Sequence, residues 1–159
     1  MAVVKPSPTG AVLSLATRLR AEGRDIISLG TGEPDFDTPA HIRAAAIEAI
    51  NAGQTRYTPT DGTAALKAAI QRKFARENDL DYAPSQIVVT CGAKQALFNL
   101  CQALLGPGDE AILPAPSWVS YQDMVRLSGA EPVFVQGGIE HDFKISHEQL
   151  SQAITPRTR

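Results

Sequence analysis

Apolar residues recur at two different spacings along the chain, and the change between them divides the sequence into two parts. In the first part they recur every three to four residues, which is typical of helices with one buried face. The pattern predicts helices over about 11–22, over about 39–52, and from about Thr63 onward. After Pro84, short continuous apolar runs alternate with helical stretches, which indicates strands joined by helices.

The elements expected after Pro84 follow one another in a regular order. Strands are predicted at 87–89, 111–113 and 132–135, and helices at about 95–105, through 124–127 and at about 147–154. This alternation argues for a mostly parallel sheet with right-handed helical crossovers. The apolar faces of these helices, including Leu97, Leu100, Cys101 and Leu104, are expected to point inward.

The beginning of the chain lacks this regular alternation of strands and helices. Pro6 and Pro8 favour an extended arm over the first ten residues. The apolar run 26–29 predicts a further short strand. The predicted fold class is therefore α/β, with an N-terminal arm and helices followed by part of a mostly parallel sheet.

Composition narrows the range of partners. Of the 159 residues 43% are hydrophobic and 20% charged, the net charge is −2, and basic residues form no patch that would suit nucleic acid. No run approaches the roughly 18 apolar residues of a membrane helix. Neither the two cysteines, Cys91 and Cys101, nor the scattered histidines show a metal-ligand spacing. We expect free thiols, a cytoplasmic protein, and neither a nucleic-acid nor a membrane partner.

The strongest candidate for chemistry is the turn Gly92-Ala93-Lys94, between a predicted strand and a predicted helix. The free N–H groups and positive dipole of a helix N-terminus attract anions such as phosphate, and small residues allow close approach to the backbone. Many α/β crossovers carry a glycine here only to make the turn, so the motif alone leaves both readings open. Lys94 lacks the glycine spacing of a Walker-type loop.

Three further residues lie in predicted loops. Trp118 follows a predicted parallel strand, where an aromatic ring can stack on a flat ligand or simply belong to the core. Tyr57 can donate to a phosphate, although by itself it reads as a surface tyrosine. Gly32 could bring its backbone beside a ligand, and the acids that follow it are explained by turn chemistry better than by paired acid–base catalysis.

Taken together, four segments resemble the ordered blocks of class I aminotransferases of fold type I, which depend on pyridoxal 5'-phosphate (PLP). They are 28–39, 55–62, 92–99 and 114–121, and the resemblance covers nearly the whole chain. The nearest subgroup is the bacterial aspartate aminotransferases, some of which also accept prephenate. The resemblance implies transfer of an amino group between an L-amino acid, with aspartate the first choice, and a 2-oxo acid through PLP.

The resemblance also implies roles for individual residues. Gly92, Ala93 and Lys94 would hold the PLP phosphate, and Trp118 would stack on its pyridine ring. Tyr57 would reach the phosphate of the neighbouring subunit in a homodimer.

On the substrate side, Gly32 and Trp118 would face the bound amino acid, with the Gly32 main chain at its α-carboxylate. The arm near 5–9 would lie on the partner subunit. Residues 1–38 are expected to form the arm and a substrate-side segment, and 39–159 an incomplete PLP-binding large domain.

The Schiff-base lysine of the family has no counterpart among the lysines of this chain, so we name no catalytic residue and expect an N-terminal fragment that is inactive alone. Two alternatives remain. The chain could be a non-catalytic module that binds phosphate compounds or pairs with another subunit. It could also come from another fold-type I enzyme, such as an aromatic or alanine aminotransferase or a carbon–sulfur lyase.

Overall fold

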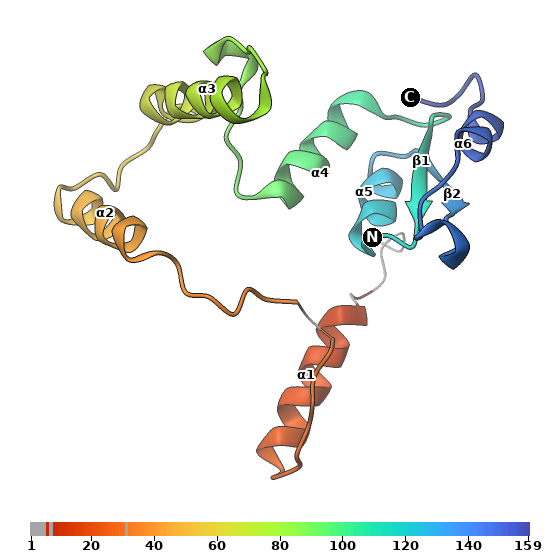
Figure 1. Ribbon diagram of the computed structural model, residues 1–159, viewed down its shortest axis with the longest axis horizontal. Helices are drawn as coiled ribbons and strands as arrows, with labels where there is room; N and C mark the ends of the chain where they lie inside the picture. Colours follow the sequence, from red (N-terminus) through yellow and green to blue (C-terminus); the bar gives the residue numbers. More distant parts are fainter. Residues whose placement is uncertain (1–5, 7, 31) are drawn as a thin grey trace. The chain divides into compact units, whose positions relative to one another are not determined.

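The computed structural model describes residues 6, 8–30 and 32–159. Contacts divide the described residues into two compact units: unit 1 comprises those within 1–30 and 92–159, and unit 2 those within 32–91. The elements in chain order are α1 (Pro8–Ala21), α2 (Ala40–Asn51), α3 (Ala64–Asn78), η1 (Pro84–Gln86), α4 (Ala93–Leu104), β1 (Glu110–Ala115), α5 (Ser120–Leu127), β2 (Glu131–Gln136), η2 (Ile139–His141) and α6 (His147–Ala153) (Figure 1).

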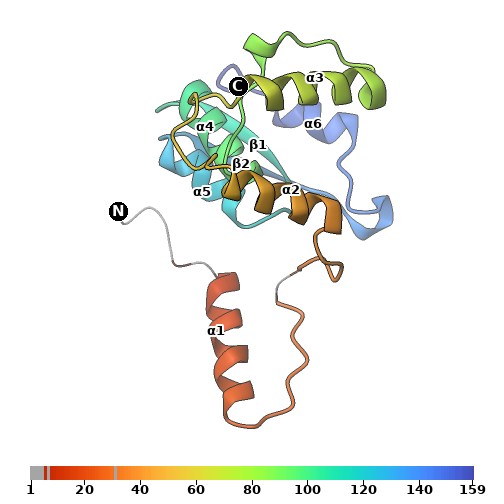
Figure 2. The same cartoon turned by 90° about the vertical axis from the view of Figure 1, so that its left-hand side faces the viewer.

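Unit 1 contains a parallel pair of strands. β1 and β2 run side by side, with Glu110 opposite Glu131 and Ala115 opposite Gln136. The α5 helix connects them and contacts both strands, and in both views it lies beside the pair (Figures 1 and 2). The predicted strands 111–113 and 132–135, their parallel direction and the connecting helix are confirmed.

The buried core of unit 1 is built around α5. Val125 is only 2% exposed, and Met124 beside it is also buried. Ala115 of β1 and Val135 of β2 are buried as well. Fully burying a valine or methionine side chain stabilises a fold by about 1.5–3 kcal/mol, so these few residues account for much of what holds the strands and the helix together.

The C-terminal segment contacts β1 at its start, through Glu110. Thr158 forms a parallel bridge with Glu110, and the Arg159 amide donates to the Glu110 carbonyl at 3.1 Å. The Glu110 carboxylate is buried and accepts hydrogen bonds from Thr155 and Arg157. A buried carboxylate is tolerated only when it is paired in this way. One isolated bridge and these side-chain bonds therefore hold the C-terminal segment against the two-stranded sheet.

Unit 2 is helical. The α3 helix begins after Thr63, whose hydroxyl accepts a hydrogen bond from the Leu66 amide at 3.3 Å and so caps the helix. The α2 helix begins one residue later than the pattern suggests, because Pro39 has an extended ψ of 140° and stands outside the helix as its N-cap. Among the described residues of unit 2, Ile87 is the one buried hydrophobic side chain.

The predicted strands 26–29 and 87–89 are wrong, because both segments lack secondary structure. A strand exists only through a ladder of hydrogen bonds with a neighbour, and no described segment forms such a ladder with either. Val89 makes one such bond, from its amide to the Asp61 carbonyl at 3.0 Å. Ile27 and Leu29 are 87% and 94% exposed.

Two other expectations need correction. Pro8 begins α1 instead of belonging to an extended arm, because proline suits the first helical position, where no amide donor is needed. Lys5 and Ser7 of the expected arm lie outside the described residues. On α4, Leu100 and Leu104 do not face inward, since both are more than half exposed and α5 is the element that α4 contacts.

Candidate functional site

The predicted phosphate turn lies at the N-terminus of α4. Gly92 is the N-cap residue, with a φ of +84°, and the helix begins at Ala93. A Cβ added at Gly92 would meet no atom within 4 Å, so there is open space beside this residue. Since positive φ is costly for residues with a Cβ, the glycine serves the turn and also leaves the backbone accessible. The α4 dipole favours negative charge at this end.

Trp118 lies between β1 and α5, at the carboxyl end of β1. It is 40% exposed and meets the Tyr121 ring edge-on, with 5.4 Å between ring centroids. Trp118 borders an open hollow of about 390 Å³, whose other lining residues are Ala115, Pro116, Ser117, Val119, Gln122, Phe134 and Gln136. Ligands of parallel sheets gather at the carboxyl ends of strands, and both β1 and β2 end in this hollow.

Lys94 and Trp118 lie together. The Lys94 ammonium nitrogen stands 4.6 Å from the centroid of the Trp118 ring. This distance is within the range of a cation–π contact. The structure thus brings a cation from the first turn of α4 to the aromatic residue that follows β1, although 24 positions separate them in the sequence.

Tyr57 and Gly32 belong to unit 2. Tyr57 is fully exposed and lines an open hollow of about 530 Å³ with Thr55, Arg56 and Thr58. Gly32 is also exposed, and a Cβ there would meet nothing within 4 Å. Both residues are open to solvent, and the described structure shows no polar contact that would fix a role for either.

Sequence reasoning did not single out Lys67 and Asp61. Lys67 is buried, and its ammonium donates to the Asp61 carboxylate. That hydrogen bond, with help from the backbone of Asp61, lowers the pKa of the Asp61 carboxyl. The one available signal was a lysine inside the apolar face of a helix, between Leu66 and Ile70, with an acid six residues before it.

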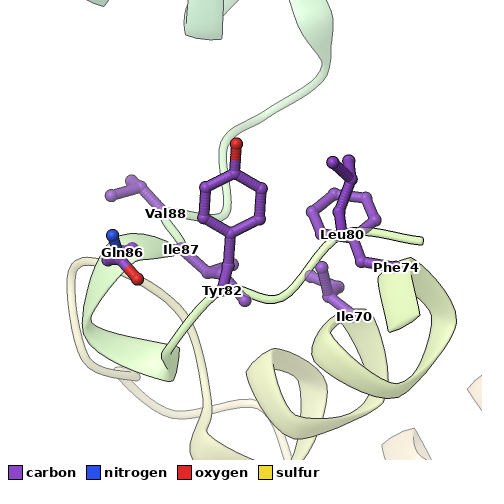
Figure 3. A pocket seen from close by; sticks show the side chains of 7 residues that line it. All are labelled: Ile70, Phe74, Leu80, Tyr82, Gln86, Ile87 and Val88. Carbon is purple, nitrogen blue, oxygen red and sulfur yellow. The ribbon is translucent and has the colours of Figure 1, made fainter. Parts of the chain in front are cut away.

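Unit 2 also has an apolar hollow of about 600 Å³, shown in Figure 3. Ile70 and Phe74 of α3 line it together with Leu80, Tyr82, Gln86, Ile87 and Val88. The lining has no charged side chain, so it lacks the groups that would hold a phosphate or a carboxylate. We therefore assign the candidate site to the Lys94–Trp118 region.

The remaining features add little chemistry. Within the described residues, no group of histidine, cysteine and acidic side chains could hold a metal ion. None of the helices described is both long and apolar enough to cross a membrane. Cys91 and Cys101 form no disulfide with each other, and burial raises the pKa of the Cys101 thiol.

Comparison with known proteins places this geometry in context. The family model described as aminotransferase class I and II matches residues 24–159. An aspartate/prephenate aminotransferase of Nitrosomonas europaea is 59% identical over 156 residues, which are 98% of this chain and 39% of the relative. An aspartate aminotransferase of Geobacillus stearothermophilus is 54% identical over 159 residues, 100% of this chain and 40% of the relative.

Solved structures of aspartate aminotransferases are similar to this chain as well. The aspartate aminotransferase of Thermus thermophilus with maleate superposes with a TM-score of 0.94 and 49% identity, covering 98% of this chain and 41% of that one. The crystal structure of the Rhizobium meliloti aspartate aminotransferase gives a TM-score of 0.92 at 47% identity, covering 98% and 39%. The chain therefore spans about 40% of the length of the curated relatives it matches.

Proposed function

The chain belongs to the class I and II aminotransferase family, and we propose that it supplies the phosphate-binding and ring-stacking part of an aspartate aminotransferase-like enzyme. The enzyme would move an amino group between an L-amino acid, with aspartate the first choice, and a 2-oxo acid. The observation that carries the proposal is the contact between Lys94 and Trp118 beside the N-terminus of α4.

The residues present fit PLP, which combines a phosphate with a flat aromatic ring. The open helix end at Gly92 and Ala93 suits the phosphate, because backbone N–H groups and the helix dipole favour an anion. Lys94 adds a positive charge, and the exposed ring of Trp118 offers a stacking surface. When bound, PLP serves as the electron sink for proton removal at the amino acid Cα.

Each residue has a separate task in this proposal. Gly92 and Ala93 would bind the phosphate through the main chain, and Lys94 would neutralise its charge. Trp118 would fix the plane of the cofactor ring and exclude water from its covered face. Lys94 stands over that ring, within reach of the same cofactor that Trp118 would stack on.

The proposal extends to residues of unit 2 and to a partner. Tyr57 would donate to the cofactor phosphate of a second subunit in a homodimer, which is consistent with its fully exposed side chain. The Gly32 main chain would meet the substrate α-carboxylate. Residues 1–38 would serve as arm and substrate-side segment, and 39–159 as the incomplete large domain. A cytoplasmic location would suit two cysteines that form no disulfide with each other.

Equilibrium dialysis with PLP tests the site. Lys94→Ala should weaken PLP binding by about tenfold or more, since it removes a charge-assisted contact worth about 1.5–3 kcal/mol. Lys144→Ala removes the same charge elsewhere in unit 1 and is the matched control, expected to bind as the wild type does. Trp118→Leu should weaken binding by about three- to tenfold through the lost stacking.

Two outcomes would count against the proposal. Equal weakening by Lys94→Ala and Lys144→Ala would mean that only general charge attracts the cofactor. Inorganic phosphate binding as tightly as PLP would mean that Trp118 contributes nothing, and would favour a non-catalytic phosphate-binding module instead.

A further inference from the structure

A buried lysine occupies an unusual place in unit 2. Lys67 projects from the first turn of α3 and is only 8% exposed, which is rare for lysine unless its charge is paired. Its partner is the Asp61 carboxylate, which lies just before the helix. The ion pair therefore links α3 to the loop that precedes it.

The loop that contains Asp61 also contacts a third segment, residues 87–89. The Asp61 carbonyl accepts a hydrogen bond from the Val89 amide at 3.0 Å. At Gly62, where φ is +104°, an added Cβ would come within 2.5 Å of a Val89 methyl carbon and 3.8 Å of the Lys67 stem. Lys67, Asp61 and Val89 thus converge on a glycine that has no room for a side chain.

Both connected segments lead to residues of the candidate site. Asp61 is four positions after Tyr57 in one loop, and Val89 is three positions before Gly92 in the sequence. The 87–89 segment has no strand partner among the described residues, and the bond from Val89 to Asp61 connects it to the loop before α3. Losing the Lys67 charge would release Asp61 and, with it, the hold on Val89.

We propose that the Lys67–Asp61 ion pair is a positioning element that fixes the Tyr57 loop against the segment leading into the Gly92 turn. This inference rests on the proposed function for its link to PLP. Lys67 is a positioning residue, since it acts through Asp61 and contacts no cofactor. The buried stem of Lys67 against Gly62 fixes the direction from which its charge reaches Asp61.

Amide hydrogen exchange on the complete chain tests the inference. Lys67→Met keeps an apolar stem and removes the charge. It should speed exchange by about tenfold or more at the Gly62 and Val89 amides, which donate to the Pro59 and Asp61 carbonyls. Exchange in α2, which belongs to the same unit, should stay unchanged. Lys67→Arg should restore slow exchange. Lys73→Met, which removes an exposed lysine from the same helix, should behave as the wild type does.

The inference is overturned if Lys67→Met leaves exchange in both segments unchanged, or speeds α2 equally, which would indicate ordinary loss of stability. It also fails if Lys67→Arg exchanges as fast as Lys67→Met. PLP dialysis adds a separate result: weaker binding by Lys67→Met but not by Lys73→Met supports the link to the cofactor, and unchanged binding overturns it. If the wild type binds no PLP, the proposed function fails, and exchange alone decides the positioning role.

Discussion

Two apolar runs of three residues each form different structures in the two units. In unit 1, the run 111–113 lies within β1 and pairs in parallel with β2. In unit 2, the run 87–89 forms no strand, and its main-chain bonds go to Pro84 and to the Asp61 loop. The difference teaches that a strand depends on a partner elsewhere in the chain, and that an apolar run supplies only the ability to pair.

The helices of the two units differ in the same way. α5 buries Met124 and Val125 between its neighbours, whereas α2 has no buried residue. Helical periodicity was correct in both cases, yet only α5 has strands beside it to cover its apolar face. We therefore expect substitutions to disturb the two units by different mechanisms: loss of packing in unit 1, and loss of loop geometry in unit 2.

The largest effect is expected in the packed core of unit 1. Val125→Asp would bury an unpaired charge and should lower the free energy of unfolding by about 3 kcal/mol or more. The control is Leu127→Asp on the same helix, at a site that is about half exposed, where little change is expected. Urea unfolding followed by the fluorescence of Trp118, the single tryptophan, measures both. Equal losses would contradict the assignment of the core to α5.

A smaller effect is expected at the loop contact of unit 2. Gly62→Ala would force a positive φ on alanine and press its Cβ against Val89, at a cost of about 2–4 kcal/mol. Gly53→Ala also has a positive φ but open space around the Cβ, so it should cost only about 1 kcal/mol. Thermal unfolding followed by circular dichroism compares them. Equal costs would show that Val89 does not pack on this loop.

The smallest effect is a pH dependence at Asp61. Because its pKa is lower in the folded chain than in the unfolded one, its contribution is complete above the unfolded pKa of about 3.9 and is lost as pH falls through the folded value. The stability difference between wild type and Asp61→Asn should therefore be largest near neutral pH and vanish in acid. Urea midpoints at several pH values measure it. A difference that grows in acid would contradict the lowered pKa.

Features set by residues close together in the sequence could be predicted, and features that depend on distant pairing could not. The strands at 111–113 and 132–135 were predictable because both partners lie in the chain and one helix connects them. The run 26–29 could not be judged locally, since its fate depends on pairing that a pattern does not encode. The start of α1 was misjudged because proline favours both an extended arm and a first helical turn.

In the candidate site, too, only the locally determined features could be predicted. Gly92 and Trp118 follow from local rules about helix ends and strand ends, and the structure adds the contact of Lys94 with Trp118. The Lys67–Asp61 pair was not predicted, because it is recognised only from the burial of Lys67 and from the hydrogen bond of Val89 to Asp61. Neither property is visible from the spacing of charges along a helix.

We propose that this chain binds PLP through phosphate and ring contacts without a lysine that anchors it covalently. The most direct test is the intact mass of the chain after incubation with PLP and reduction with borohydride. We predict no adduct, or a partial one scattered over several lysines. A single stoichiometric adduct on one lysine would contradict the claim, because the chain would then hold a covalent cofactor site of its own.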